Sequence, residues 1–216
     1  TTVIGWTIPK LAGLAQVHGA KISAEGVSAL KEKLGFEDKP FAIDLEMVQQ
    51  VRAAFAERGK GLREVWDEKF AAWHDANPDG AALLERMLAH KLPDDLDIPT
   101  FEPGKMSTRK ASGAVLSALG PQLPELWGGS ADLAGSNNTT MKGADSFLPG
   151  DRCSEKDPGG PYGRTIHFGV REHAMGGILN GITLAGLTRC YGGTFFVFSD
   201  YMRPSVRLAA LMKIPS

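Results

Sequence analysis

Segments typical of strands alternate with segments typical of helices over the second half of the chain. In chain order they lie at about 108–119 (helix), 126–128 (strand), 165–168 (strand), 171–184 (helix), 189–198 (strand) and 203–212 (helix). Strands that alternate with helices favour a parallel sheet covered by helices on both faces. We therefore predict an α/β fold for this half. In such sheets ligands bind beyond the carboxyl ends of the strands.

The first half has a different pattern. A strand is expected at Val3–Thr7, and helical periodicity follows at about 27–34, 44–58, 61–75 and 80–90, with breaks at Gly, Pro and Asp. The stretch 91–105 contains three prolines and four acidic residues and has little periodicity, so it is typical of a linker. We place a domain boundary there, which divides the chain into residues 1–97 and 98–216.

Charge and composition exclude several classes of partner. The 24 Lys and Arg residues nearly balance 25 Asp and Glu residues, so the chain lacks the basic character expected of a nucleic-acid or anionic-membrane binder. No apolar run approaches the roughly 18 residues of a membrane span. Cys153 and Cys190 are the only cysteines, and no signal segment precedes them, which favours reduced thiols in a cytoplasmic protein. Because Thr1 opens directly on an apolar run, a fragment of a longer protein is expected.

Glu172 stands at the expected junction of a strand and a helix, in the stretch HFGVREHAMG. An acidic residue in the first turn of a helix interacts favourably with the helix dipole, and most such residues do nothing else. The helix after it carries an apolar stripe that includes Met175, Leu179 and Ile182, so it is expected to be buried with its start at a cleft. A partly desolvated carboxylate at that place is a candidate catalytic group.

Two further stretches admit a structural and a functional interpretation. Phe195, Phe198 and Tyr201 recur at three-residue intervals, which is consistent with core packing or with a pocket for a flat ring. The stretch GGSADLAGSN at 128–137 is consistent with a plain loop or with a ligand loop. It lacks the G-x-S-x-G spacing of a hydrolase nucleophile. Since no H-E-x-x-H motif or cysteine pair is present either, a zinc site is not predicted.

Read together, several stretches in register resemble the transketolase family. They are TRKAS at 108–112, GGSADLAGSN at 128–137, HFGVREHAMGGILNGI at 167–182 and YGGTFFVFSDYMR from 191, with VRLAALM ending at 212. Their order and spacing resemble the pyrimidine-binding domain of that family. The stretch VIGWTIPKLAGLAQVHGA resembles the end of its diphosphate-binding domain. The resemblance covers nearly the whole chain and implies a thiamine-diphosphate-binding fold, preceded by a mostly helical segment.

The resemblance implies roles for particular residues. Catalytic roles would fall on Glu172, which would bind the aminopyrimidine of thiamine diphosphate, and on His18. The cofactor would contact Glu172, Phe195, Phe198, Tyr201, Asp132 and His18, and the sugar phosphate substrate would contact Arg109, Ser136 and His18. The implied reaction moves a two-carbon ketol unit from a ketose phosphate to an aldose phosphate through a carbanion of the cofactor.

The resemblance also implies Mg²⁺ and a homodimer with the active site at its interface. The Gly-Asp-Gly metal motif of the family does not occur here, so we expect no metal ligand from this chain, and we expect the chain alone to be inactive. Two alternatives stay open from the sequence: a dihydroxyacetone-synthase-like transketolase, and a non-catalytic protein built on the pyrimidine domain. Glu172 with its aromatic residues argues against the second, since a pure scaffold needs no carboxylate at that place.

Overall fold

A computed structural model describes residues 2–8, 10–19, 21–155 and 158–216, which group into two compact units, 1–73 and 74–216. The elements of the first unit are η1 (Ala15–His18), α1 (Ala24–Leu34) and most of α2 (Leu45–Ala76). Those of the second are α3 (Pro78–Leu88), α4 (Thr108–Gln122), β1 (Leu126–Ser130), α5 (Ala134–Asn137), β2 (Ser146–Phe147), η2 (Gly150–Arg152), β3 (Gly159–Gly160), β4 (Thr165–His167), α6 (Glu172–Ala185), β5 (Arg189–Gly193), η3 (Phe196–Met202) and α7 (Arg203–Met212).

Two predictions for the first unit are wrong. Residues 4–7 form turns instead of a strand, and both Gly5 and Thr7 have positive φ angles, of 65° and 70°. The helices expected at 44–58 and 61–75 are one helix, because Gly59 and Gly61 continue α2 without a break. Glycine weakens a helix but does not forbid one, so a glycine pair alone does not locate a helix end.

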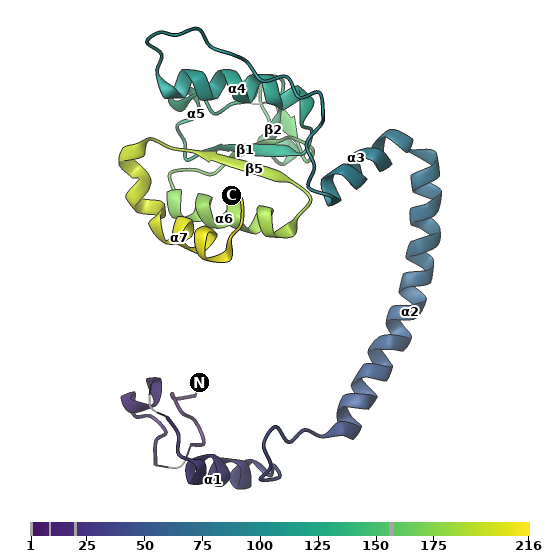
Figure 1. Cartoon of the computed structure of the whole chain (residues 1–216), viewed down its shortest axis with the longest axis vertical. Coiled ribbons are helices and arrows are strands. Elements are labelled where there is room, and N and C mark those ends of the chain that lie inside the picture. Colours follow the sequence, from purple (N-terminus) through teal and green to yellow (C-terminus); the bar gives the residue numbers. More distant parts are fainter. Residues whose placement is uncertain (1, 9, 20, 156–157) are drawn as a thin grey trace. The chain divides into compact units, whose positions relative to one another are not determined.

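The second unit is built on a five-stranded sheet in the order β3-β2-β4-β1-β5, and every strand pair is parallel. Helices α4 and α5 lie on one face of this sheet and α6 and α7 on the other (Figure 1). The predicted α/β architecture with helices on both faces is confirmed. The expected strand at 189–198 is shorter than predicted, since β5 ends at Gly193 and a 3₁₀ helix follows.

Each face of the sheet has its own core, and β5 contributes to both. Cys190 packs in a cluster with Met175 and Leu179 of α6, whereas Tyr191 packs in a cluster on the α4 side that is centred on Met141. This alternation follows from the pleat of a strand, which points successive side chains to opposite faces. The two cores fix β5 and β1 between the helix layers and hold the carboxyl ends of the strands in place.

At the amino ends of the strands, a buried carboxylate joins the sheet to α3. Glu125, which precedes β1, is 3% exposed. Arg86 of α3 donates to both of its oxygens, over 2.7 and 3.0 Å, and Arg189 Nε lies 3.9 Å from the first. Arg189 also donates to the carbonyl oxygens of His90 and Lys91. The end opposite to the candidate site is therefore fixed by an ion-pair network.

Candidate active site

Glu172 is the first residue of α6 and is only 7% exposed. It follows β4, so its carboxyl group lies at the carboxyl end of the sheet, where the predicted strand-to-helix junction placed it. Thr194, the residue after β5, donates its hydroxyl to Glu172 Oε1 over a long 3.5 Å. A buried carboxyl group with one weak partner retains hydrogen-bonding capacity for a ligand.

The aromatic row consists of Phe198 and Tyr201, which share one side of a 3₁₀ helix, and of Phe195, which caps the start of that helix. Because this helix has three residues per turn, side chains at i and i+3 lie one above the other. Phe195 caps η3, and the rings of Phe198 and Tyr201 within it are 6.2 Å apart and inclined by 30°. Tyr201 is 64% exposed, so the row is open to a ligand rather than closed in the core. Since η3 packs against α6, Glu172 and the aromatic row come from adjacent elements.

A hydrogen-bond network that the sequence did not predict shapes the loop after β1. Ser130 Oγ donates to the carbonyl oxygen of Gly193 and accepts from the amide of Leu133 and from Asn137 Nδ2, over 2.9 to 3.1 Å. Thr139 in turn donates to Asn137 Oδ1 over 2.8 Å. The small polar residues of the stretch 128–137 are a visible signal for this local network, but the contact of Ser130 with Gly193 of β5 depends on strand pairing and could not be inferred from the sequence.

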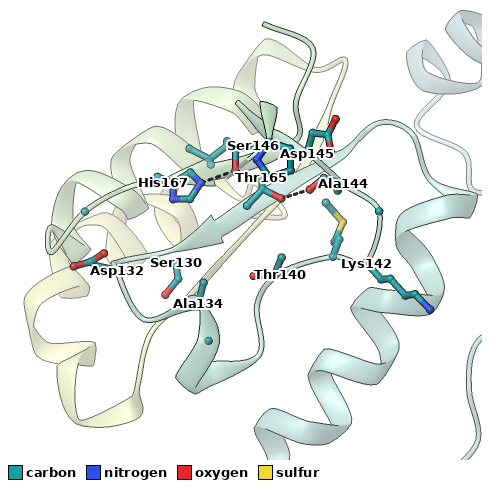
Figure 2. Close-up of a pocket in the computed structure, with 16 residues that line it drawn as sticks. Ser130, Asp132, Ala134, Thr140, Lys142, Ala144, Asp145, Ser146, Thr165 and His167 are labelled. Atoms are coloured by element: carbon teal, nitrogen blue, oxygen red, sulfur yellow. Dashed lines mark hydrogen bonds between the residues drawn. The ribbon is translucent and has the colours of Figure 1, made fainter. Parts of the chain in front are cut away.

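Asp132 lies in this loop with a φ of 63°, the left-handed region that Asp tolerates better than most residues. It lines a cavity of about 630 Å³ whose walls include the end of β1, the segment 140–146 that leads into β2, and β4 (Figure 2). In the same cavity wall Ser146 Oγ and His167 Nε2 share a 2.8 Å hydrogen bond. Glu172 and the aromatic row do not line this cavity.

The remaining predicted residues lie on other elements. Arg109, in the first turn of α4, and Ser136, in α5, are both exposed, and these two helices are in contact. His18 ends η1 and belongs to the first unit. The structure thus places Glu172 and the aromatic row on elements that contact each other, and Arg109 on a helix that contacts that of Ser136.

Metal and thiol chemistry have few candidates in the chain. Within the described residues, no group of three or more His, Cys, Asp or Glu side chains could hold a metal ion. Cys153 and Cys190 are free thiols, and burial raises the pKa of Cys190. In the same described part, no helix is long and apolar enough to cross a membrane.

A parallel α/β sheet with a buried carboxyl group at a helix start, at the carboxyl end of its strands, belongs to a class of folds that bind ligands at that end. Two family comparisons make this specific: residues 104–216 match "Transketolase, pyrimidine binding domain" and residues 1–93 match "Transketolase, thiamine diphosphate binding domain". The chain belongs to the transketolase family.

Relatives and solved structures agree with this result. The chain is 57% identical to the transketolase of Mycobacterium bovis and 43% identical to that of Geobacillus stearothermophilus, in each case over 99% of the chain and 31% of the relative. It therefore spans about a third of the length of these relatives. A transketolase variant from Pichia stipitis superimposes with a TM-score of 0.84 at 40% identity, covering 100% of this chain and 32% of that one. The Campylobacter jejuni transketolase gives 0.69 at 33% identity, covering 96% and 30%.

Proposed function

We propose that this chain carries the pyrimidine-binding half of a transketolase site, which transfers a two-carbon ketol unit between sugar phosphates. The observation that carries the proposal is Glu172. It is a buried carboxyl group at the start of α6, next to an aromatic row on η3, in a chain of the transketolase family.

Thiamine diphosphate fits the residues present. Its aminopyrimidine is a flat ring with polar nitrogens, which suits a carboxyl group of free hydrogen-bonding capacity beside aromatic faces. Glu172 would bind a ring nitrogen and hold or release a proton there, while Phe195, Phe198 and Tyr201 would shield the ring from water. Asp132 and His18 would complete the contacts. When bound, the cofactor supplies the carbon centre that carries the two-carbon unit.

The substrate assignment rests on charge and on related structures. Arg109 presents a planar guanidinium group at an exposed helix start, which suits a phosphate group, and Ser136 and His18 would add hydrogen bonds. Pichia stipitis transketolase structures are described as complexes with fructose 6-phosphate, xylulose 5-phosphate and sedoheptulose 7-phosphate. A sugar phosphate is accordingly the substrate class proposed here.

Four further parts of the assignment are proposals of the same kind. Magnesium would neutralise the diphosphate of the cofactor and would be held by residues outside this sequence. A homodimer would bring the two halves of the site together. The near-neutral charge and the free thiols favour a cytoplasmic location. The proposed domain boundary stays at residues 97 and 98, in the segment between α3 and α4.

Replacement of Glu172 by Gln tests the proposal in the complete polypeptide encoded by the gene. The amide keeps the shape but cannot exchange a proton, so ketol transfer should fall by about 10²-fold to 10⁴-fold while the fold survives. Transfer from xylulose 5-phosphate to ribose 5-phosphate, assayed with thiamine diphosphate and magnesium, measures the effect. Glu102→Gln, in the exposed segment before α4, is the control and should keep full activity. Near-normal turnover of the Glu172 variant would refute the assigned role.

A further inference from the structure

Ser205, near the start of α7, joins this helix to the first turn of α6. It is 2% exposed. Its hydroxyl group donates to the carbonyl oxygen of His173 over 2.9 Å, and the same Oγ lies 2.9 Å from His173 Nδ1. A serine hydroxyl donates one hydrogen bond and accepts others, so both bonds form together when the imidazole carries its proton on Nδ1. We call Ser205 and His173 the Ser–His clamp.

Two further contacts hold the same two helices together. Asn180, two turns further along α6, donates Nδ2 to the carbonyl oxygen of Ser205 over 2.9 Å. Between His173 and Asn180, on the same face of the helix, a Cβ on Gly176 would lie 2.7 Å from the Cβ of Ser205, which is closer than carbon atoms pack. Only glycine therefore fits at residue 176 while α7 keeps its present distance from α6.

The position of the clamp in the chain connects it with the candidate site. His173 follows Glu172 directly, and α7, which carries Ser205, begins immediately after η3, which carries Phe198 and Tyr201. Helix α6 is in contact with both η3 and α7, and it lies with α7 on one face of the sheet (Figure 1). Because neighbouring residues of a helix turn move together, a bond to the His173 carbonyl group also restrains Glu172.

We propose that Ser205 and His173 are positioning residues of the ring-binding site, and that they hold Glu172 and the aromatic row at the separation that a flat ring requires. The inference rests on the proposed function, since it takes the aminopyrimidine as that ring. Both residues act through Glu172 and η3 instead of through the cofactor. Without the clamp, the start of α6 and η3 would adopt other separations, and the apparent affinity for the ring would fall with the fraction of competent molecules.

Replacement of Ser205 by Ala in the complete polypeptide encoded by the gene tests the clamp. The variant loses both hydrogen bonds to His173 and gains no volume. The dissociation constant of thiamine diphosphate, measured by isothermal titration calorimetry with magnesium, should rise about threefold to tenfold. The KM for xylulose 5-phosphate at saturating cofactor should stay unchanged, because Arg109 and Ser136 lie on helices at the other face of the sheet (Figure 1).

Variants of His173 separate the hydrogen bond from the bulk of the side chain. His173→Leu should weaken cofactor binding as Ser205→Ala does. His173→Asn should restore much of the affinity, because its amide group places a hydrogen-bonding atom near the position of Nδ1. Gly176→Ala keeps every hydrogen-bonding group but forces the helices apart, so it should also raise the dissociation constant. It provides a second perturbation of the same separation.

Thr183→Val is the matched control at the other end of α6. Thr183 donates to the carbonyl oxygen of Leu179 and lies 3.2 Å from Cys190 Sγ, so the variant loses hydrogen bonds of this helix without a change in its first turn. Its dissociation constant for the cofactor should equal that of the parent. Equal weakening in Thr183→Val and Ser205→Ala would overturn the proposal, because it would trace the effect to general destabilisation of α6.

A purely structural clamp would give a different pattern. It would lower the urea midpoint of Ser205→Ala and leave the dissociation constant of the cofactor unchanged, which would overturn the proposal, as would a His173→Asn variant as weak as His173→Leu. Loss of turnover in Glu172→Gln with an unchanged dissociation constant in Ser205→Ala would reject the clamp alone. Weakened binding in Ser205→Ala with an active Glu172→Gln enzyme would retain the clamp and reject the proton-transfer role. A parent polypeptide that did not bind the cofactor would reject both.

Discussion

Removing Arg86 should destabilise the second unit far more than removing an exposed arginine. The perturbation is Arg86→Met, which keeps the length of the side chain but leaves the carboxylate of Glu125 without its two short hydrogen bonds. The Glu125 side chain is 2% exposed, so water cannot replace them. Breaking a buried pair by removing one partner typically costs about 3 to 5 kcal/mol. Because Arg189 stays 3.9 Å away and still offsets part of the charge, we expect a loss at or just below the lower end of that range, about 2 to 3 kcal/mol.

Urea unfolding of the chain, monitored by circular dichroism, measures this free energy. Arg152→Met is the control, because its pair with Asp151 is 3.8 Å long and both side chains are at least 75% exposed. That variant should change the free energy of unfolding by less than about 0.5 kcal/mol. Adding Glu125→Gln to Arg86→Met should recover more than about 1 kcal/mol, because a neutral amide is less costly to bury than an unpaired charge.

A loss below about 1 kcal/mol for Arg86→Met, which is the size expected of a surface pair, would contradict this reasoning. Strict additivity of the two substitutions would contradict it as well, because two residues that act through one ion pair must show an interaction free energy.

Two other predictions concern the sheet. Burial raises the pKa of Tyr191 to about 12, so the folded state holds the phenol proton more tightly than the unfolded state, and stability should fall by about 1 to 2 kcal/mol as the pH rises from about 10 to 12. Urea unfolding at pH 7 and pH 11 measures this pH dependence, which Tyr191→Phe should lack. An equal loss of stability at pH 11 in the variant and in the parent chain would refute the assignment to Tyr191. Gly129→Ala should destabilise the sheet by more than about 2 kcal/mol because the new Cβ would overlap the carbonyl oxygen of Ile166. Gly177→Ala, on the open side of α6, should stabilise the chain slightly because alanine favours a helix more than glycine does. Equal unfolding midpoints for the two variants would contradict this.

The sequence predicted the second half of the fold well, because its signals are local. The segment Arg203–Met212 has a proline in its first turn and keeps helical periodicity, and its predicted bounds match the structure. The sequence also places Glu172 at a helix start, where α6 begins. The strand predicted at residues 3–7 is wrong because the apolar character of these residues indicates only that they could be buried. A strand also requires a partner strand, which the sequence of this segment does not reveal.

The site was only partly predictable for the same physical reason. The spacing of Phe195, Phe198 and Tyr201 is visible in the sequence, but only the 3₁₀ geometry of η3 shows that Phe198 and Tyr201 share one side. Ser146 and His167 are 21 positions apart and meet only because β2 pairs with β4. Contacts that depend on strand order are not encoded in any one stretch. Whether the predicted residues perform their assigned roles stays a prediction.

The continuity of α2 through Gly59 and Gly61 has a consequence for local dynamics. No described residue of α2 is buried, so little tertiary packing supports the middle of the helix. Each glycine weakens a helix by about 1 kcal/mol relative to alanine, and a helix opens where propagation is weakest. Backbone amides near residue 60 should therefore exchange with deuterium faster than those in the middle of either flanking half. The helix is in this sense two cooperative segments joined by a link that opens readily, and a protease would find its first cleavage site there.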